Sequence, residues 1–257
     1  LAGSIIRSAP DMQLQASGNG LHYMGKVEGQ PGSLVTMSVF DDEIIGMISI
    51  PGQPDLVIGK LDNTDTYIAY NDHQVKEYFH FSCETPDDGE PYRAEQLNYK
   101  RTERSAGDCI QLYIEVDNDI YVDKGGLVPT QNYIAALCNQ VIALYQAENI
   151  GITISEILIW TSPSVYIDGT MAQTLDKFKS TRSVFNGDLG ILLSYQFGGG
   201  LAQLDGLCRS EQKYSLAYAG IYPSFENVPT YSWSVEVMAH ELGHLLGSRH
   251  THACVWN

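Results

Sequence analysis

Five residues near the end of the chain have the types and the spacing of a metal site. They are His240, Glu241, His244, Gly247 and His250, in the pattern H-E-x-x-H-x-x-G-x-x-H. Residues four apart lie on one face of an α-helix, so the first two histidines can present their imidazoles to the same ion. The glycine permits a left-handed turn that brings back the third histidine. Three neutral histidines with a fourth position for water are typical of a catalytic zinc site.

Glu241 directly follows the first histidine and is the candidate general base. Bound zinc lowers the pKa of water towards about 7, so a carboxylate here can take its proton and deliver it to a leaving amine. The alternative is that Glu241 is an ordinary surface residue of the helix. A purely structural zinc site needs no base, so the intact glutamate favours hydrolytic chemistry.

The stretch 240–250 resembles the signature of the metzincin zinc endopeptidases, and residues 251–256 resemble bacterial relatives of the reprolysin (adamalysin-like) branch. Upstream, residues 22–29, 33–35 and 46–48 resemble the propeptide of reprolysin-type proteases. The resemblance implies a secreted zinc endopeptidase made as a zymogen, with one catalytic Zn2+ and a protein or peptide substrate. It also implies that the pro-domain is an intramolecular inhibitor. Whether Ca2+ supports the fold stays open.

The chain departs from the family pattern in two respects. Many reprolysin-type proteases have aspartate directly after the third histidine, whereas this chain has Thr251. Metzincins also have a Met-containing turn beneath the zinc and a C-terminal subdomain, but none of the six methionines lies after the motif. We therefore expect a fragment that lacks the C-terminal subdomain, whose own activity does not follow from the motif.

The composition describes a globular protein with an acidic surface. Of 257 residues, 44% are hydrophobic and 18% charged, and 15 basic against 31 acidic residues give a formal net charge of −16. This charge repels phosphates, so no nucleic-acid partner is expected, and it suits an extracellular protein. No apolar run reaches about 18 residues, so no membrane span is expected. The chain begins at Leu1 without a signal-peptide pattern, and we expect that a signal peptide has been removed.

Residues 1–106 are expected to form a β-rich pro-domain with its linker. Turn-forming Gly and Pro residues separate short runs of β-branched and aromatic residues, and no helical period appears. The expected strands are 34–40, 43–50, 56–61 and 66–70. Positive charge gathers at residues 100–107. An exposed basic linker is a site where a protease cuts, so we expect processing within residues 92–108.

Residues 107–257 are expected to form the N-terminal part of a metzincin-like α/β catalytic domain, which makes the whole chain α+β. Alternating strand-like and helix-like segments predict βαβ units and a twisted, mostly parallel sheet. The expected strands are 110–116, 152–160, 189–195 and 214–222. The expected helices are 129–144, one opened by a capping box at 170–173, and the zinc-binding helix from about 232–234.

Cys83 is a candidate inhibitory switch. It lies late in the pro-like region, where several metzincin zymogens place a cysteine that binds the zinc, and a thiolate is a strong zinc ligand. The surrounding residues match no known switch motif closely, and a buried or disulfide-bonded cysteine is the alternative. The other cysteines permit three pairings among which the sequence does not choose: Cys109, Cys138, Cys208 and Cys254.

Gly198, Gly199 and Gly200 lie where the resemblance implies an exposed edge strand that pairs with an extended substrate. Their backbone suits strand addition, and a flexible loop is the alternative. Two other functions remain compatible with the sequence. One is a non-catalytic zinc-binding or adhesion module that retains the metzincin fold, and the other is a metallohydrolase acting on something other than proteins. The sequence does not reveal the cleavage specificity or the physiological substrate.

Overall fold

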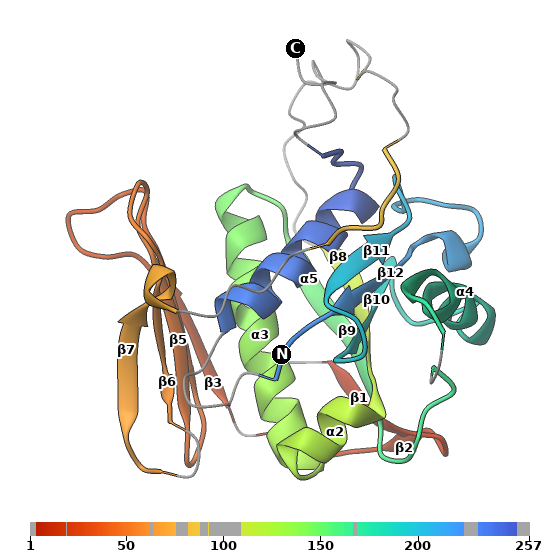
Figure 1. Cartoon of the computed structure of the whole chain (residues 1–257), viewed down its shortest axis with the longest axis horizontal. Helices are drawn as coiled ribbons and strands as arrows, with labels where there is room; N and C mark the ends of the chain where they lie inside the picture. Colours follow the sequence, from red (N-terminus) through yellow and green to blue (C-terminus); the bar gives the residue numbers. More distant parts are fainter. Residues whose placement is uncertain are drawn as a thin grey trace.

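The chain folds into two β-sheets with helices between and beside them, an α+β arrangement (Figure 1). The computed structural model describes residues 4–18, 20–61, 64–75, 82–87, 92, 109–166, 169–223 and 231–250. In this part of the chain the larger sheet has seven strands in the order β11-β12-β10-β8-β9-β1-β2. The smaller sheet has five strands in the order β3-β4-β5-β6-β7.

Five strands from the second half of the chain form most of the larger sheet. They are β8 (Ile110–Val116), β9 (Ile152–Trp160), β10 (Leu189–Ser194), β11 (Gly199–Ala202) and β12 (Leu216–Gly220). β8, β9, β10 and β12 run parallel, whereas β11 is antiparallel to β12 at one edge. All residues of β10 and β12 are buried, because helices cover both faces of the sheet. The expected strands and the predominance of parallel pairs are confirmed.

Four helices pack against the larger sheet in the described residues. They are α2 (Asn118–Lys124), α3 (Leu127–Ala147), α4 (Met171–Thr181) and α5 (Tyr231–Leu245). Figure 1 shows α3 and α5 on one face of the sheet and α4 on the other. The predicted capping box opens α4, since Thr170 and Gln173 exchange side-chain hydrogen bonds with each other's backbone N–H. None of the described helices is both long and apolar enough to cross a membrane.

The smaller sheet is an antiparallel meander that packs on α3. Its strands are β3 (Leu21–Gly25), β4 (Leu34–Val39), β5 (Ile44–Ser49), β6 (Leu56–Lys60) and β7 (Tyr67–Asn71), followed by the short 3-10 turn η1 (Asp72–Gln74). Its buried Ile45, Met47 and Val57 belong to the same apolar core as α3. Buried residues occur all around α3 because the helix lies between the two sheets (Figure 1).

The first strand does not follow the expected division of the chain. β1 (Ile5–Ala9) pairs in parallel with β9 in the larger sheet, and β2 (Gln13–Leu14) pairs antiparallel with β1. Both strands of this N-terminal segment thus belong to the larger sheet. The sequence patterns do not predict this strand, because pairing between such distant segments leaves no local signal. Apart from this strand, the division at residue 106 stays a prediction.

Candidate metal centre

Helix α5 holds the first two histidines of the motif in a fixed position. Val237, Met238, Leu242 and Leu245 are fully buried and join the core beneath the larger sheet. The Tyr145 hydroxyl of α3 donates a hydrogen bond of 2.6 Å to the backbone carbonyl of Ala239. A helix packed in this way holds its side chains to the small positional tolerance that a metal ion requires.

The chain leaves α5 through a turn at Gly247, as the motif predicts. Gly247 has φ 93°, in the left-handed region. Its N–H donates to His244 O at 2.9 Å, and Ser248 N donates to Gly243 O at 2.8 Å. A Cβ atom at Gly247 would lie 2.5 Å from Asp205 Oδ1. Both the backbone conformation and the lack of space therefore favour glycine, and the turn brings His250 back towards α5.

The three histidines of the motif, here called the histidine cluster (His240, His244 and His250), meet Cys83. One possible ligand atom from each of the four residues lies within 4.8 Å of the others. His244 Nε2 is 2.9 Å from His240 Nε2 and 3.4 Å from Cys83 Sγ. Zinc bonds of about 2.0–2.3 Å place tetrahedral nitrogen and sulfur ligands about 3.3–3.6 Å apart. Three imidazoles and one thiol thus fit a four-coordinate zinc ion in number and type, and their atoms lie close enough to share one ion.

Hydrogen bonds orient two of the three rings. His244 Nδ1 is 2.6 Å from Ser248 O, which only accepts, so Nδ1 carries the proton and Nε2 offers its lone pair to the cluster. His250 Nδ1 is 2.8 Å from Asp87 Oδ1, which fixes that ring in the same way. Burial lowers the pKa of His244, which favours the neutral form that binds a metal.

Glu241 is fully buried beside the cluster and is not a surface residue of the helix. Thr85 Oγ1 is its hydrogen-bond donor, at 3.4 Å from Oε2. Burial raises the pKa of Glu241 to about 8, although hydrogen bonds from Cys83 and Thr85 oppose the rise. Burial and the Glu241 carboxyl raise the pKa of Cys83 to about 11. The thiol is therefore protonated unless a bound cation stabilises the thiolate.

The glycine-rich stretch forms an edge strand, not a flexible loop. Gly199 and Gly200 lie in β11, and Gly198 directly precedes it. Residues 82–87, here called segment 82–87, run parallel to this edge: Gly200 N donates to Ser82 O at 3.1 Å, and Glu84 N donates to Gly200 O at 2.9 Å. A Cβ atom at Gly199 would collide with Ser82 O. The edge thus accepts an extended segment at close range.

Sequence reasoning missed three residues at this site. Thr85 accepts a hydrogen bond from Ala202 N at 2.8 Å, in addition to its contact with Glu241. Asp87 contacts His250. The Tyr92 hydroxyl accepts from Arg249 N at 2.8 Å and donates to Gly247 O at 3.2 Å. The only local signal was the acidic, turn-prone character of residues 85–91.

The cysteines outside the centre carry free thiols where the structure describes them. Cys109 and Cys208 are exposed and Cys138 is buried, and Cys83 also has no disulfide partner. Cys254 lies outside the described residues, as do Thr251 and most of the predicted processing region. Cys83 therefore forms no disulfide among the described residues. Whether Cys254 pairs with another cysteine stays open.

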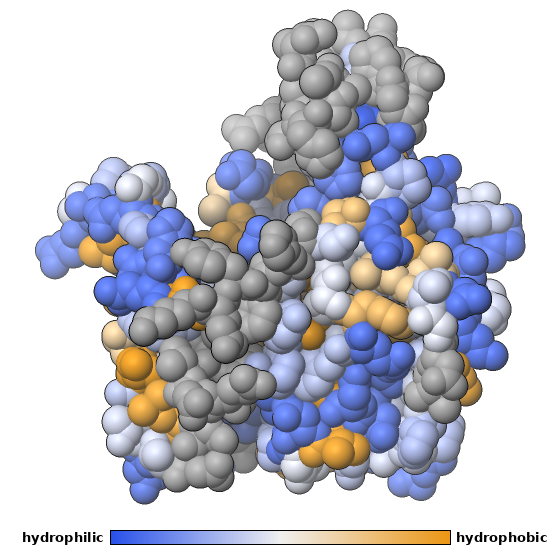
Figure 2. Space-filling view, in the orientation of Figure 1, coloured by the Kyte–Doolittle hydropathy of each residue, from blue (hydrophilic) through white to orange (hydrophobic). Residues whose placement is uncertain are grey.

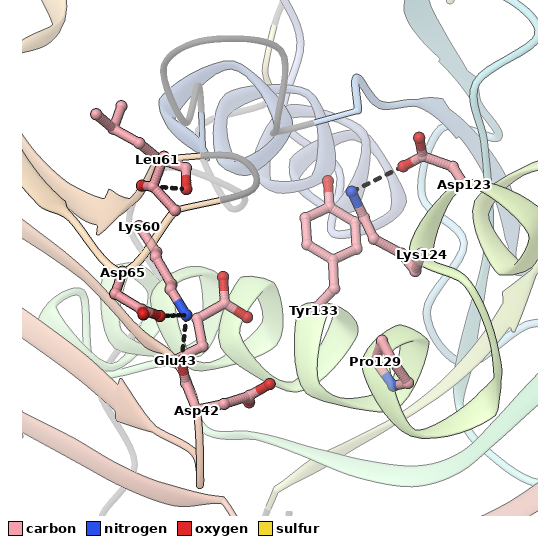
Figure 3. Close-up of a pocket in the computed structure, with 10 residues that line it drawn as sticks. Asp42, Glu43, Lys60, Leu61, Asp65, Asp123, Lys124, Pro129 and Tyr133 are labelled. Atoms are coloured by element: carbon pink, nitrogen blue, oxygen red, sulfur yellow. Dashed lines mark hydrogen bonds and ion pairs between the residues drawn. The ribbon is translucent and has the colours of Figure 1, made fainter.

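A pocket, here called the hollow, lies between the smaller sheet and helices α2 and α3 (Figure 3). It has a volume of about 550 Å³, and its lysines already contact carboxylates. Lys60 Nζ is 3.2 Å from Asp65 Oδ1, and Lys124 Nζ is 2.8 Å from Asp123 Oδ2 and lies over the Tyr133 ring. The lining also contains Asp42 and Glu43, so it is acidic overall, and it lies where the smaller sheet meets α2 and α3. The face of the molecule in Figure 2 carries many hydrophilic residues, in line with the acidic composition.

Comparisons with known proteins support a metallopeptidase. The reprolysin model described as metallo-peptidase family M12 matches residues 107–255. The chain is 25% identical over 279 residues to the zinc metalloproteinase-disintegrin-like BfMP of Bungarus fasciatus, with 98% of this chain and 43% of that protein covered. It thus spans less than half of that relative's length. Metalloproteinase-II from Bacteroides fragilis has a similar fold, with a TM-score of 0.50 at 13% identity over 98% of this chain and 76% of that one.

The family match includes α5, the turn at Gly247 and the whole histidine cluster, and it covers more than half of the chain. Membership implies a zinc site, and the donor set at the cluster fits one. The chain belongs to the metallopeptidase family M12, as a reprolysin-like metzincin.

Proposed function

We propose that the chain comprises the pro-domain and the N-terminal catalytic part of a secreted zinc endopeptidase that is made as a zymogen. The observation that carries this proposal is the meeting of Cys83, from the N-terminal half, with the histidine cluster and Glu241. The pro-domain corresponds to residues 1–106 and the catalytic part to residues 107–257. The partners of the processed protein would be protein or peptide substrates.

His240, His244 and His250 would hold the zinc through neutral imidazole nitrogens. When bound, zinc supplies a Lewis acid that polarises a peptide carbonyl and makes water more acidic. Glu241 would take the proton of the attacking water at its carboxylate and deliver it to the leaving amine. Burial of Glu241, which raises its pKa, suits both receiving and returning a proton near neutral pH.

The edge of β11 would bind the substrate backbone by strand addition. Gly200 offers both its N–H and its C=O at this edge, and in the present chain both are taken by segment 82–87. Ala202 N, further along the same strand, is taken by Thr85. A substrate and segment 82–87 would therefore compete for the same hydrogen-bonding groups.

Latency would follow from three contacts that segment 82–87 makes at once. Cys83 Sγ would take the fourth ligand position, beside His244 Nε2, while Thr85 contacts Glu241, the proposed base, and Asp87 contacts His250. The fourth ligand position is the one that water must occupy for catalysis. The segment thus covers the metal, the base and the substrate edge together.

A non-catalytic zinc-binding or adhesion module would need fewer of these features. It requires neither a buried carboxylate beside the histidines nor an edge strand that accepts an extended segment. Both features are present, and they favour the endopeptidase.

The test is the variant Glu241→Gln in the full-length protein after processing and removal of the pro-domain, assayed on a denatured protein substrate. Glutamine keeps the shape of the side chain but cannot accept the proton, so we expect cleavage to fall by about 10²–10⁴-fold. Metal analysis should still find one zinc per chain, because the histidines are unchanged. Undiminished cleavage by this variant, or cleavage that survives complete removal of zinc by a chelator, would overturn the proposal.

A further inference from the structure

The outer edge of β9 is occupied by the first strand of the chain. β1 pairs in parallel with β9 over five residues, from Ile5 opposite Glu156 to Ala9 opposite Trp160. The contact continues past the strand, where Ala9 O accepts from Thr161 N at 3.1 Å and from Thr161 Oγ1 at 3.0 Å. Without β1 and the short β2, β9 would be the last strand of the sheet on this side.

Side chains on both faces of β1 are buried. Ile6 is 4% exposed on one face, and Ala9 is 1% exposed on the other, where it joins the cluster that contains Trp160 and the apolar side of α4. A strand buried on both faces is packed like an internal strand of the sheet, not like a loosely attached edge. Burial and main-chain hydrogen bonds thus act together over the same few residues.

An ion pair fixes the register of β1. Arg7 Nε lies 3.2 Å from Glu156 Oε1, and the Glu156 side chain is 8% exposed. A slip of one residue would turn Arg7 to the other face of the sheet and leave this nearly buried carboxylate without its cation. The site therefore selects a strand with a basic residue between small and apolar neighbours, as in Ile6-Arg7-Ser8-Ala9.

We propose that the outer edge of β9 is a binding site for a parallel β-strand, and that its occupant after processing is residues 5–9 of the cleaved pro-domain. The inference rests on the proposed function in one respect, namely that the chain is cut between the pro-domain and the catalytic part. Residues 5–9 precede any cut within residues 92–108 by a long stretch of chain, so the cut leaves their pairing with β9 intact. Cleavage of the linker alone then yields a two-chain complex that remains latent.

The strand site adds to two other contacts between the parts. The smaller sheet packs on α3, where Asn139 Nδ2 donates to Tyr23 O at 3.3 Å, and segment 82–87 lies on β11. β1 lies at the opposite end of the larger sheet from β11. The pro-domain therefore holds the catalytic part at both ends of its sheet, and release at one end leaves the other attached.

The experiment uses the full chain with the recognition sequence of a specific protease inserted between Ala106 and Gly107. After the cut, the rate at which residues 1–106 leave immobilised residues 107–257 is measured on dilution. We expect the wild-type parts to stay together through size-exclusion chromatography. Arg7→Glu should raise the dissociation rate by about tenfold or more, because it places two like charges at a nearly buried site. Glu156→Arg should do the same from the other side.

The double variant Arg7→Glu with Glu156→Arg restores an ion pair of reversed polarity and should return the rate to within about threefold of wild type. Lys26→Glu is the matched control, since it makes the same charge change at an exposed residue outside the strand that pairs with β9. Immediate separation of the wild-type parts, or equal rates for Arg7→Glu and Lys26→Glu, would overturn the inference. The readout needs neither zinc nor activity, so it is independent of the outcome with Glu241→Gln.

Discussion

At the scale of single residues, the proposed latency depends on where the Cys83 side chain lies. Its sulfur lies 3.4 Å from His244 Nε2, and its backbone is held by the pairing of Ser82 and Glu84 with Gly200. The hydrogen bonds of its neighbours thus place the thiol without any contribution from a switch motif in the sequence. The segment positions the sulfur through main-chain contacts, for which many sequences are suitable.

Replacement of Cys83 by serine tests this placement. A serine hydroxyl keeps the size of the side chain but is a poor zinc ligand, so the unprocessed full-length Cys83→Ser protein should cleave a peptide substrate at least about tenfold faster than the unprocessed wild type. Cys208→Ser, which changes an exposed free thiol elsewhere, is the control and should have no effect. Equal rates of peptide cleavage by the two variants would contradict the proposed switch.

At the scale of elements, the turn that ends α5 matters as much as the helix. α5 presents two histidines, but the third returns only because Gly247 has φ 93°. The turn also receives contacts from Tyr92, whose hydroxyl bonds to Gly247 O and Arg249 N. Helix α5, its turn and Tyr92 from the N-terminal half are therefore joined directly beside the histidine cluster.

Substitution of Gly247 by alanine should destabilise this turn. The left-handed conformation costs a residue with a Cβ atom about 1–2 kcal/mol, and the contact with Asp205 adds to that cost. We expect a lower free energy of unfolding in urea and weaker zinc binding. Gly25→Ala is the control, because a Cβ atom there meets nothing within 4 Å. A Gly247→Ala protein as stable as the Gly25→Ala protein would contradict this account of the turn.

At the scale of the whole molecule, α3 and the larger sheet are the surfaces on which the N-terminal half is assembled. The smaller sheet covers α3, β1 extends the larger sheet beyond β9, and segment 82–87 covers β11. The segments that make these contacts are far apart in the N-terminal half, but all of them pack on the second half of the chain. The N-terminal half thus forms an additional layer of the fold.

This arrangement predicts slow loss of zinc from the unprocessed protein. A fourth protein ligand and the cover of segment 82–87 should retard transfer of zinc to a chromogenic chelator by about ten- to a hundredfold relative to residues 107–257 freed of the pro-domain. Unprocessed Cys83→Ser should lie between the two, since it keeps the cover but loses the fourth ligand. If the unprocessed protein and the freed residues 107–257 lose zinc at the same rate, the pro-domain does not close the site.

The sequence by itself determined the parts that depend on neighbouring residues. The motif of α5 with its glycine turn, the capping box of α4 and strands β4 to β7 of the smaller sheet follow from helical spacing, capping chemistry and alternation, whereas β3 was not predicted. Short α2 was missed, although Asp117 caps it, because seven residues carry little periodic signal. The predicted ligand triad is local for the same reason, since all three histidines lie within one helix and its turn.

Only the tertiary structure decided which distant segments meet. The contacts of Thr85, Asp87 and Tyr92 with the centre, and of β1 with β9, join residues that are far apart in the chain. Such pairings depend on the packing of the intervening core and on main-chain hydrogen bonds, which are common to nearly all residue types. A local pattern therefore specifies the metal-binding helix. The position of segment 82–87 on that helix and on β11 depends instead on how the sheets and α3 pack.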